Sequence, residues 1–286
     1  MKALFTITLL TCCVATYVAA SQPTPIWEQT GFEQPESALV DPMTGLVYIS
    51  NIAGQPMEKN AQGYISQLNA DGTVREKHWA SDMNAPKGMA IVDNHLLVAD
   101  IDRLRVFNLD TGIQTQELMA DAGMLNDIAA DSAGNAYISD MLGTQLFRYH
   151  DGELELWLNS EELQHPNGVF VDGEDLIVAT WGHPIADDFT TQTPGSLMRI
   201  SLADKNLQPI TGGEQLGNLD GVVKIGDAFW VNDWINGALY RVTDGRAEKI
   251  AQYPAGLADI NIGGGLLFLP LMLDGEVSAV DITSLP

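Results

Sequence analysis

The sequence predicts an all-β fold, a six-bladed β-propeller with four-stranded blades. Three observations indicate it: a repeat of roughly 40 to 50 residues, short alternating strands within each repeat, and turn signals between the strands. Turns such as Asp71-Gly72, Asp151-Gly152 and Asp244-Gly245 punctuate the chain, and no stretch keeps apolar residues at helical spacing for long. Four short antiparallel strands fit a repeat of this length, as in a propeller blade.

Six repeats begin with one pattern, a polar residue followed by a short apolar stretch. The polar residues are separated by 51, 39, 41, 53 and 39 positions, and the two longer steps indicate loops at the mouth of a central channel. Six such starts predict six blades. In chain order the starting residues are Glu36, Lys87, Asn126, Asn167, Asp220 and Asp259.

Each start is followed by strands in which apolar and polar residues alternate. The expected second strands cover residues 47–50, 96–100, 136–140, 176–179, 229–233 and 266–269. Third strands are expected at 104–107, 145–149 and 238–242, and an outer strand at 154–157. This alternation turns every second side chain of a strand toward the interior.

The last repeat is too short to form a complete blade, because only 27 residues follow Asp259. We expect residues 25–32 to supply its outer strand, so that an N-terminal strand closes the ring without a free sheet edge. Residues 21–286 are therefore predicted to form a single propeller domain.

The first twenty residues have the features of a secretory signal peptide. Lys2 precedes an apolar run over residues 3–10, and small residues end at Ala20. Export to the periplasm or the exterior is the prediction, and lipoprotein anchoring at Cys13 is the alternative, which Cys12 disfavours because a small residue normally precedes the lipidated cysteine. Both cysteines lie in this segment, so the processed chain would carry no disulfide and no thiolate metal ligand.

The chain is strongly acidic, with 38 Asp and Glu residues against 14 Lys and Arg residues and a formal net charge of −24. Such a surface repels phosphate backbones and anionic lipids, which argues against nucleic-acid binding and membrane adhesion. No later segment is long and apolar enough to be expected to insert into a membrane. Solubility alone is enough to explain the acidity, and the oligomeric state stays open.

The starting residues of the repeats are expected to meet, because a rotational repeat puts equivalent positions on one ring around the channel. Glu36, Asn126, Asn167 and Asp220 would then offer two carboxylates and two amides, a set of hard oxygen donors. Such a set suits Ca²⁺ best, with Mg²⁺, Mn²⁺ or Zn²⁺ as alternatives. The competing interpretation is a polar, water-filled channel without a metal.

Five further residues are candidates for binding or support. Lys87 shares the ring and would bind a substrate oxygen, unless it only forms a structural ion pair. Trp181 and His183 belong to a long mouth loop and are candidate substrate-binding residues, although loop histidines are often simply exposed. Asp127 and Asp259 are expected behind the ligands, as hydrogen-bond acceptors or around a second cation, unless they only form turns.

Four short motifs occur in order at blade spacing, namely Pro35-Glu36-Ser37, Leu125-Asn126-Asp127-Ile128, Pro166-Asn167-Gly168 and Asn218-Leu219-Asp220-Gly221-Val222. Weaker matches lie at 84–89, 139–141, 193–196 and 232–234. In this order the motifs resemble the senescence marker protein/gluconolactonase/luciferin-regenerating enzyme family, in an exported bacterial branch. Paraoxonases and diisopropyl fluorophosphatase are similar six-bladed relatives. The resemblance covers nearly the whole chain after the leader.

The resemblance implies a metal-dependent lactonase or esterase whose divalent cation is held by Glu36, Asn126, Asn167 and Asp220. In such enzymes the metal polarises the carbonyl of a small lactone or ester, and Asp220 would be the catalytic base or nucleophile. The chain departs from the family at Ser37-Ala38, where gluconolactonases usually carry Gly-Pro, and it has no counterpart of the paraoxonase histidine pair. A propeller that binds a protein or small ligand without catalysis is the alternative, because fold alone does not decide function. Synthase-like chemistry is disfavoured, since strictosidine synthases generally lack the full metal set.

Overall fold

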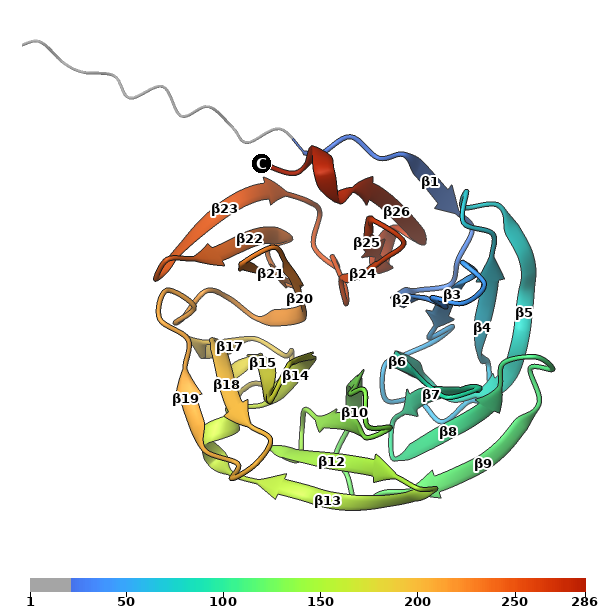
Figure 1. The fold of residues 1–286 in the computed structure, drawn as a ribbon, viewed down its shortest axis with the longest axis horizontal. Helices are drawn as coiled ribbons and strands as arrows, with labels where there is room; N and C mark the ends of the chain where they lie inside the picture. Colours follow the sequence, from blue (N-terminus) through green and yellow to red (C-terminus); the bar gives the residue numbers. More distant parts are fainter. Residues whose placement is uncertain (1–21) are drawn as a thin grey trace, which may run out of the picture.

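The protein forms a six-bladed β-propeller, which confirms the predicted fold class. In the computed structural model, which describes residues 22–286, six four-stranded antiparallel sheets surround a central channel (Figure 1). The only helical segments in this part of the chain are three short 3₁₀ turns, η1 (Glu161–Leu163), η2 (Met272–Asp274) and η3 (Ile282–Ser284). Within the same residues no helix has the length and apolar character needed to span a membrane. The predicted signal peptide, with Cys12 and Cys13, lies outside the described residues.

The first three blades are each built from four consecutive strands that run from the channel outward. Blade one contains β2 (Pro35–Val40), β3 (Val47–Asn51), β4 (Gly63–Leu68) and β5 (Val74–Met83). Blade two contains β6 (Pro86–Val92), β7 (His95–Asp100), β8 (Arg103–Asn108) and β9 (Gln114–Met119). Blade three contains β10 (Leu125–Ala130), β11 (Ala136–Asp140), β12 (Gln145–His150) and β13 (Glu153–Asn159).

Blade four carries an insertion, and blade five repeats the simple pattern. Blade four contains β14 (Pro166–Asp172), β15 (Asp175–Thr180), β18 (Leu197–Ser201) and β19 (Leu207–Pro209). A separate hairpin of β16 (Gly182–Ile185) and β17 (Thr191–Pro194) is inserted between β15 and β18. Blade five contains β20 (Leu219–Ile225), β21 (Ala228–Asp233), β22 (Ala238–Thr243) and β23 (Arg246–Gln252).

The sixth blade is completed from the other end of the chain, as the short last repeat predicts. Its inner three strands are β24 (Asn261–Gly263), β25 (Leu266–Leu271) and β26 (Glu276–Asp281). The outer strand is β1 (Trp27–Thr30), which pairs antiparallel with β26 so that Trp27 lies opposite Ala279. Figure 1 shows β1 beside β26, next to the C-terminus. The ring therefore closes without a free edge, which is the function that residues 25–32 were expected to serve.

A β-bulge near the start of the inner strand sets which residues face the channel. In blade three, Leu125 pairs with Asp140 and Ile128 with Ile138, so two residues lie opposite one between these pairs. The same irregularity recurs in β2, β6, β14 and β20. Glu36, Lys87, Asn126, Asn167 and Asp220 all occupy the first of the two bulged positions.

The predicted ring position of blade six is wrong by one residue. Leu257 forms a bridge with Leu271, as Leu219 pairs with Asp233 in blade five, so Ala258 corresponds to Asp220. Asp259 therefore takes the second bulged position, the position of Asp127. The alignment of the six repeats placed a polar residue at every ring position. In blade six the ring position is occupied by Ala258, and the polar residue follows one place later.

The core lies between neighbouring blades. Leu97 and Val106 of blade two pack in one cluster with Ile128 and Ile138 of blade three, and comparable clusters join the other blades. Burying one such side chain contributes about 1.5–3 kcal/mol relative to leaving it in water. Six apolar interfaces thus hold the inner strands, and the side chains at their bulges, in fixed positions around the channel.

Candidate metal centre at the channel mouth

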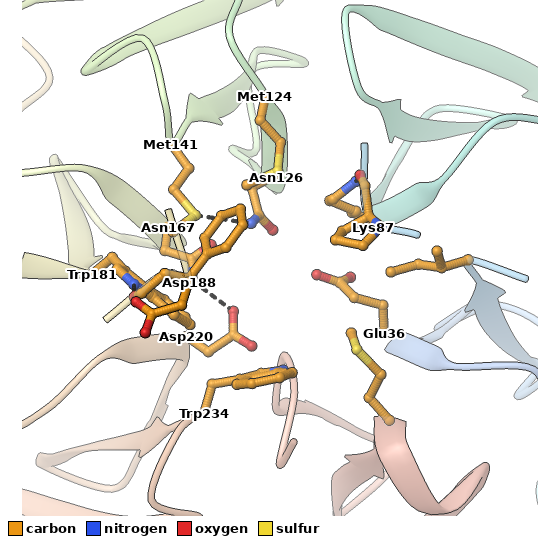
Figure 2. Close-up of a pocket in the computed structure, with 14 residues that line it drawn as sticks. Glu36, Lys87, Met124, Asn126, Met141, Asn167, Trp181, Asp188, Asp220 and Trp234 are labelled. Carbon is orange, nitrogen blue, oxygen red and sulfur yellow. Dashed lines mark hydrogen bonds between the residues drawn. The ribbon is translucent and has the colours of Figure 1, made fainter. Parts of the chain in front are cut away.

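Five of the six predicted ring residues line one cavity at the channel mouth. They are Glu36, Lys87, Asn126, Asn167 and Asp220, each supplied by a different blade. Figure 2 shows the side chains of Glu36, Asn126 and Asp220 directed toward a common centre. The cavity has a volume of about 190 Å³, which leaves room for a small ligand.

Three oxygens of this ring are buried without a hydrogen-bond partner among residues 22–286. They are Glu36 Oε2, Asn126 Oδ1 and Asn167 Oδ1. A buried polar atom without a partner costs about 1–3 kcal/mol, so three in one cavity are costly unless something binds them. All three atoms are acceptors, and they lie with a fourth oxygen-bearing side chain, Asp220. The arrangement fits a cation that accepts oxygen ligands.

The amide nitrogens of the two asparagines are already used. Asn167 Nδ2 donates to Asp220 Oδ1 at 2.8 Å and to the carbonyl of Leu219 at 3.1 Å. Asn126 Nδ2 lies 3.8 Å from the sulfur of Met141. These contacts orient both amides so that their oxygens face the cavity. Within the described chain no three His, Cys, Asp or Glu side chains form a metal-binding group, so the amide oxygens are needed to complete a ligand set.

Burial and mutual repulsion strongly affect the two ring carboxylates. Loss of hydration raises the pKa of Glu36 well above its ordinary value, and the charges of Asp220 and Asp259 raise it further. Burial, followed by the charge of Asp259, likewise raises the pKa of Asp220. A divalent cation between Glu36 and Asp220 would reverse both effects, because it stabilises the charged form of each carboxylate.

Lys87 lines the cavity but does not neutralise the ring by direct contact. Its ammonium donates to the carbonyl oxygens of Pro56 at 2.8 Å and Ala85 at 3.0 Å. No carboxylate of the described residues lies within ion-pair distance of it. Burial lowers the pKa of Lys87 to about 8, against the opposing influence of Glu36 and Asp100. The structural ion pair considered from the sequence is therefore not formed.

Asp127 and Asp259 do not line the mouth cavity; they line a second cavity at the other end of the channel. Both oxygens of Asp127 accept backbone hydrogen bonds, from Ile128 at 2.6 Å and from Val169 at 2.8 Å. Asp259 accepts a hydrogen bond from the Ser37 hydroxyl at 2.6 Å. Burial raises the pKa of Asp127 well above its ordinary value and that of Asp259 to about 7. Both thus lie behind the ring.

The two mouth-loop candidates are placed differently. Trp181 lines the cavity, and its indole N–H donates to the carbonyl of Phe189 at 2.8 Å. His183 lies in β16 and is not among the lining residues. Its Nδ1 is buried without a hydrogen-bond partner in the described chain. The structure therefore brings Trp181, but not His183, to the site.

Sequence reasoning missed a ring of apolar residues around the mouth. In all six blades the residue directly after the second strand is large and apolar; we call this set the apolar collar. All of its members except Ile101 line the cavity. The sequence carried a signal for it, because each member follows a predicted strand end by one to three residues. The apolar collar consists of Ile52, Ile101, Met141, Trp181, Trp234 and Met272.

Comparison with known proteins supports the fold. No protein-family model matches the chain, and no curated protein matches it by sequence. Among solved structures, a candidate gluconolactonase is 18% identical, with a TM-score of 0.65 over 91% of this chain and 92% of that chain. A virginiamycin B lyase from Staphylococcus aureus is 12% identical, with a TM-score of 0.61 over 88% of this chain and 97% of that one.

A further structural neighbour has no enzymatic description. It belongs to a nidogen/laminin complex and is 16% identical, with a TM-score of 0.62 over 79% of this chain and 93% of that chain. These neighbours share the propeller and differ in activity. At such identities the likeness shows the fold alone, so the function has to be argued from the site.

Proposed function

We propose that the protein is a divalent-metal-dependent hydrolase that opens a lactone or a similar ester, with Ca²⁺ as the first choice of cation. Glu36, Asn126, Asn167 and Asp220 would hold the ion. The observation that carries the proposal is the set of three unpartnered, buried oxygens, from Glu36, Asn126 and Asn167, that lie with the buried carboxylate of Asp220 in one cavity. The cation would supply Lewis-acid polarisation of the substrate carbonyl.

The residues of the chain would carry out the proton transfers. Asp220 has one oxygen fixed by Asn167, and the hydrogen bonds of the described residues leave its other oxygen free to accept a proton from water. The water oxygen then bonds to the carbonyl carbon and the ring C–O bond breaks. The proton passes to the departing oxygen, which gives a hydroxy acid. Glu36 serves mainly as a ligand, and the Lys87 charge offsets part of the negative charge of the ring.

The structural likeness to a candidate gluconolactonase supports the lactone substrate class, and the ordered motifs at blade spacing support the same family. An exported location, in the periplasm or outside the cell, is part of the proposal. It rests on the signal-peptide pattern of residues 1–20.

The proposal is tested by metal content and thermal stability, measured with and without chelator. The wild type is compared with Glu36→Ala/Asp220→Ala and with Glu153→Ala/Glu174→Ala, a control that removes the same charge from exposed positions. We expect one ion per chain in the wild type and the control. A ligand at a hundredfold excess over Kd adds about 2.7 kcal/mol of stability, and the site variant should lose this gain.

Turnover is measured on a panel of lactones and esters with Ca²⁺, Mg²⁺, Mn²⁺ or Zn²⁺. Bound metal together with ring opening supports the hydrolase. If the protein binds no ion and none of the four metals changes its melting temperature, the proposal is wrong. That outcome favours a propeller that binds a partner or ligand without turnover.

A further inference from the structure

The wall of the cavity differs in chemistry from its floor. The floor consists of the four oxygen-bearing ring residues, whereas the apolar collar surrounds the opening. Met141 and Trp181 pack with Trp234 and Phe189 in one cluster, and Ile52 packs with Met272 in another. Both clusters are separate from the six that join the blades. A substrate that reaches the floor must therefore pass between apolar side chains contributed by nearly every blade.

Most hydrogen-bond donors near the cavity are already used within the protein. The indole N–H of Trp181 donates to Phe189, the amide of Asn167 donates to Asp220, and the ammonium of Lys87 donates to two carbonyls. Among the lining side chains of the described residues, one hydrogen of Lys87, one of the Asn126 amide and the indole N–H of Trp234 remain. A polyhydroxylated ring needs several partners for its hydroxyls, and unpaired hydroxyls in a closed site cost affinity.

The inserted hairpin of blade four completes the apolar wall. Its tip carries Phe189, which lines the cavity although its backbone lies in the left-handed region with φ of 64°. Bulky residues rarely adopt this conformation. The hydrogen bonds from Phe189 N–H to Ala186 at 2.9 Å and from the Trp181 indole to the Phe189 carbonyl hold it in place. The other blades have no such hairpin, so this aromatic side chain is a specific addition to the mouth.

A negative charge at the rim opposes anionic substrates. Asp188 precedes Phe189, is exposed, and also lines the cavity. Its hydrogen bonds from the Thr190 hydroxyl and backbone lower its pKa, so it is ionised at neutral pH. This rim charge repels a substrate that carries a free carboxylate or phosphate.

We propose that the substrate is a neutral lactone or ester bearing an alkyl or aryl group, not a sugar lactone. The apolar collar and Phe189 hold the apolar group while the carbonyl reaches the four oxygen-bearing residues of the floor. This inference rests on the proposed function and narrows its substrate class. Phe189 and Trp234 are the specificity-determining residues, because they are only partly buried and remain accessible to a ligand.

The test compares δ-lactones of increasing alkyl chain length with glucono-δ-lactone, using metal-loaded protein. We expect kcat/KM to rise about fourfold for each added methylene until the cavity is filled, which corresponds to about 0.8 kcal/mol per buried CH₂. Glucono-δ-lactone should be at least about tenfold poorer than the longest well-accommodated lactone. Equal or better turnover of glucono-δ-lactone, or rates that do not depend on chain length, would overturn the inference and leave the hydrolase proposal intact.

A variant pair tests the wall directly. Phe189→Ser should reduce the ratio of long-chain to unsubstituted lactone turnover about tenfold, whereas Leu156→Ser, on the exposed side of β13, should not change it. An unchanged ratio in Phe189→Ser contradicts the assignment of this residue.

Binding of alkyl lactams, measured by calorimetry, separates the two proposals because a lactam resists hydrolysis. If no lactone is opened, the hydrolase proposal fails. The apolar inference then stands only if alkyl lactams bind at least about tenfold more tightly than the matching gluconolactam, and equal binding overturns it.

Discussion

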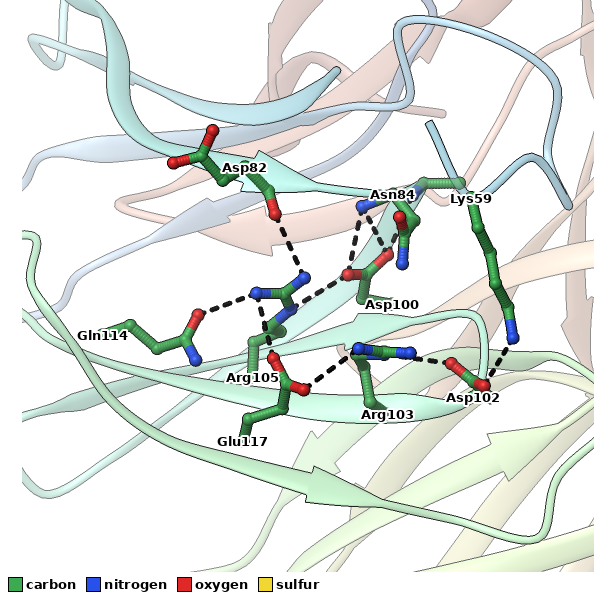
Figure 3. Close-up of polar contacts among 10 residues, drawn as sticks. Lys59, Asp82, Asn84, Asp100, Asp102, Arg103, Arg105, Gln114 and Glu117 are labelled. Atoms are coloured by element: carbon green, nitrogen blue, oxygen red, sulfur yellow. Dashed lines mark hydrogen bonds and ion pairs between the residues drawn. The ribbon is translucent and has the colours of Figure 1, made fainter. Parts of the chain in front are cut away.

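Asp100 in blade two and Glu36 at the channel mouth are both carboxylates removed from water, with 0% and 3% of their surface exposed. Asp100 accepts hydrogen bonds from the backbone of Asn84 and Ala85 and from Arg105 Nε at 3.0 Å (Figure 3). Within residues 22–286, Glu36 Oε2 has no hydrogen-bond partner and no Lys or Arg side chain contacts Glu36. A buried carboxylate thus has hydrogen-bond and ion-pair partners at Asp100, whereas at Glu36 one oxygen has none among the described residues.

The difference shows that the chain has the means to neutralise a buried carboxylate. Around Asp100 a network extends through Arg105 and Glu117 to Arg103, and on to Asp102. Among residues 22–286 no comparable network surrounds the ring, although four buried carboxylates and one ammonium, that of Lys87, lie in the channel. This difference supports the proposed cation, because buried polar groups are normally provided with partners.

The largest expected loss of folding stability comes from a substitution in the network around Asp100. Asp100→Asn removes the fully buried anion beside Arg105, which keeps only the partly exposed Glu117 as its charged partner. It also replaces one of the two acceptor oxygens with an NH₂ group that faces N–H donors, so we expect it to cost about 3–5 kcal/mol of stability. Chelator should not change this loss, which chemical denaturation measures. Glu117→Gln, at a side chain that is 34% exposed, is the control and should cost less than about 1 kcal/mol. A loss of stability near zero for Asp100→Asn would show that the partners of Asp100 do not distinguish it energetically from Glu36.

The equivalent change at the channel mouth should have the opposite sign without metal. Glu36→Gln removes a charge that burial and the charges of Asp220 and Asp259 disfavour. We expect the variant to be more stable than the wild type by about 1–2 kcal/mol in chelator, and less stable in saturating Ca²⁺. Unfolding curves in both conditions measure this reversal. Glu153→Gln, at an exposed position, serves as the control, and destabilisation by Glu36→Gln in both conditions argues against a cation site.

The pH dependence of stability should also depend on metal. The pKa of Asp259 is raised from 3.8 to about 7 in the folded protein. Between these values the folded state holds a proton that the unfolded chain has released, so metal-free stability falls as the pH rises. We expect a loss of about 2 kcal/mol from about pH 5 to about pH 7. Asp259→Asn should reduce this slope.

With Ca²⁺ present the slope should be reversed, because metal ligands bind in their deprotonated form. Denaturation across this pH range, with and without chelator, measures both slopes. Slopes of the same sign in both conditions would show that the channel carboxylates and the ion are not coupled.

Much of the fold can be predicted from local residue patterns and from the spacing of the repeats along the chain. The alternation in Val47–Asn51 and Ala136–Asp140 predicts their strands, and the short last repeat predicts closure by the segment that contains β1. The ring of Glu36, Asn126 and Asp220 follows from rotational symmetry alone. Symmetry failed at Asp259 because a one-residue offset in a bulge is not visible in a sequence without strand pairing.

The chemistry of the mouth was harder to predict, because it depends on the closed ring. Trp234 and Met272 each follow a strand end and could equally belong to the core; only the assembled blades show that they surround one opening. Phe189 comes from an insertion with no counterpart in the other blades, so no repeat could position it. His183 lies four residues from Ala179, the end of a predicted strand, yet the hairpin keeps it out of the cavity lining.

The smallest expected loss of stability comes from the Lys59–Asp102 ion pair, at the exposed end of the network around Asp100. Lys59 lies 2.6 Å from Asp102, but its side chain is 53% exposed, and Asp102 keeps its contact with Arg103 at 3.0 Å. Lys59→Met should therefore cost less than about 1 kcal/mol, and the loss should disappear in about 1 M salt, where the Debye length is about 3 Å.

Denaturation at low and high salt measures this loss, with Lys77→Met, an exposed partner of Glu33 at 3.5 Å, as the control. Lys59 belongs to the segment between β3 and β4 that carries Pro56, whose carbonyl accepts a hydrogen bond from Lys87. If Lys59→Met still costs more than about 2 kcal/mol of stability at high salt, the pair is more than a screened surface interaction.

The ion pair between Lys59 and Asp102 would then hold the segment that carries Pro56 at the wall of the cavity. The network around Asp100 and the channel mouth would in that case stabilise each other. A small, salt-sensitive loss means that solvent exposure, more than the number of ionic contacts, decides what each carboxylate contributes.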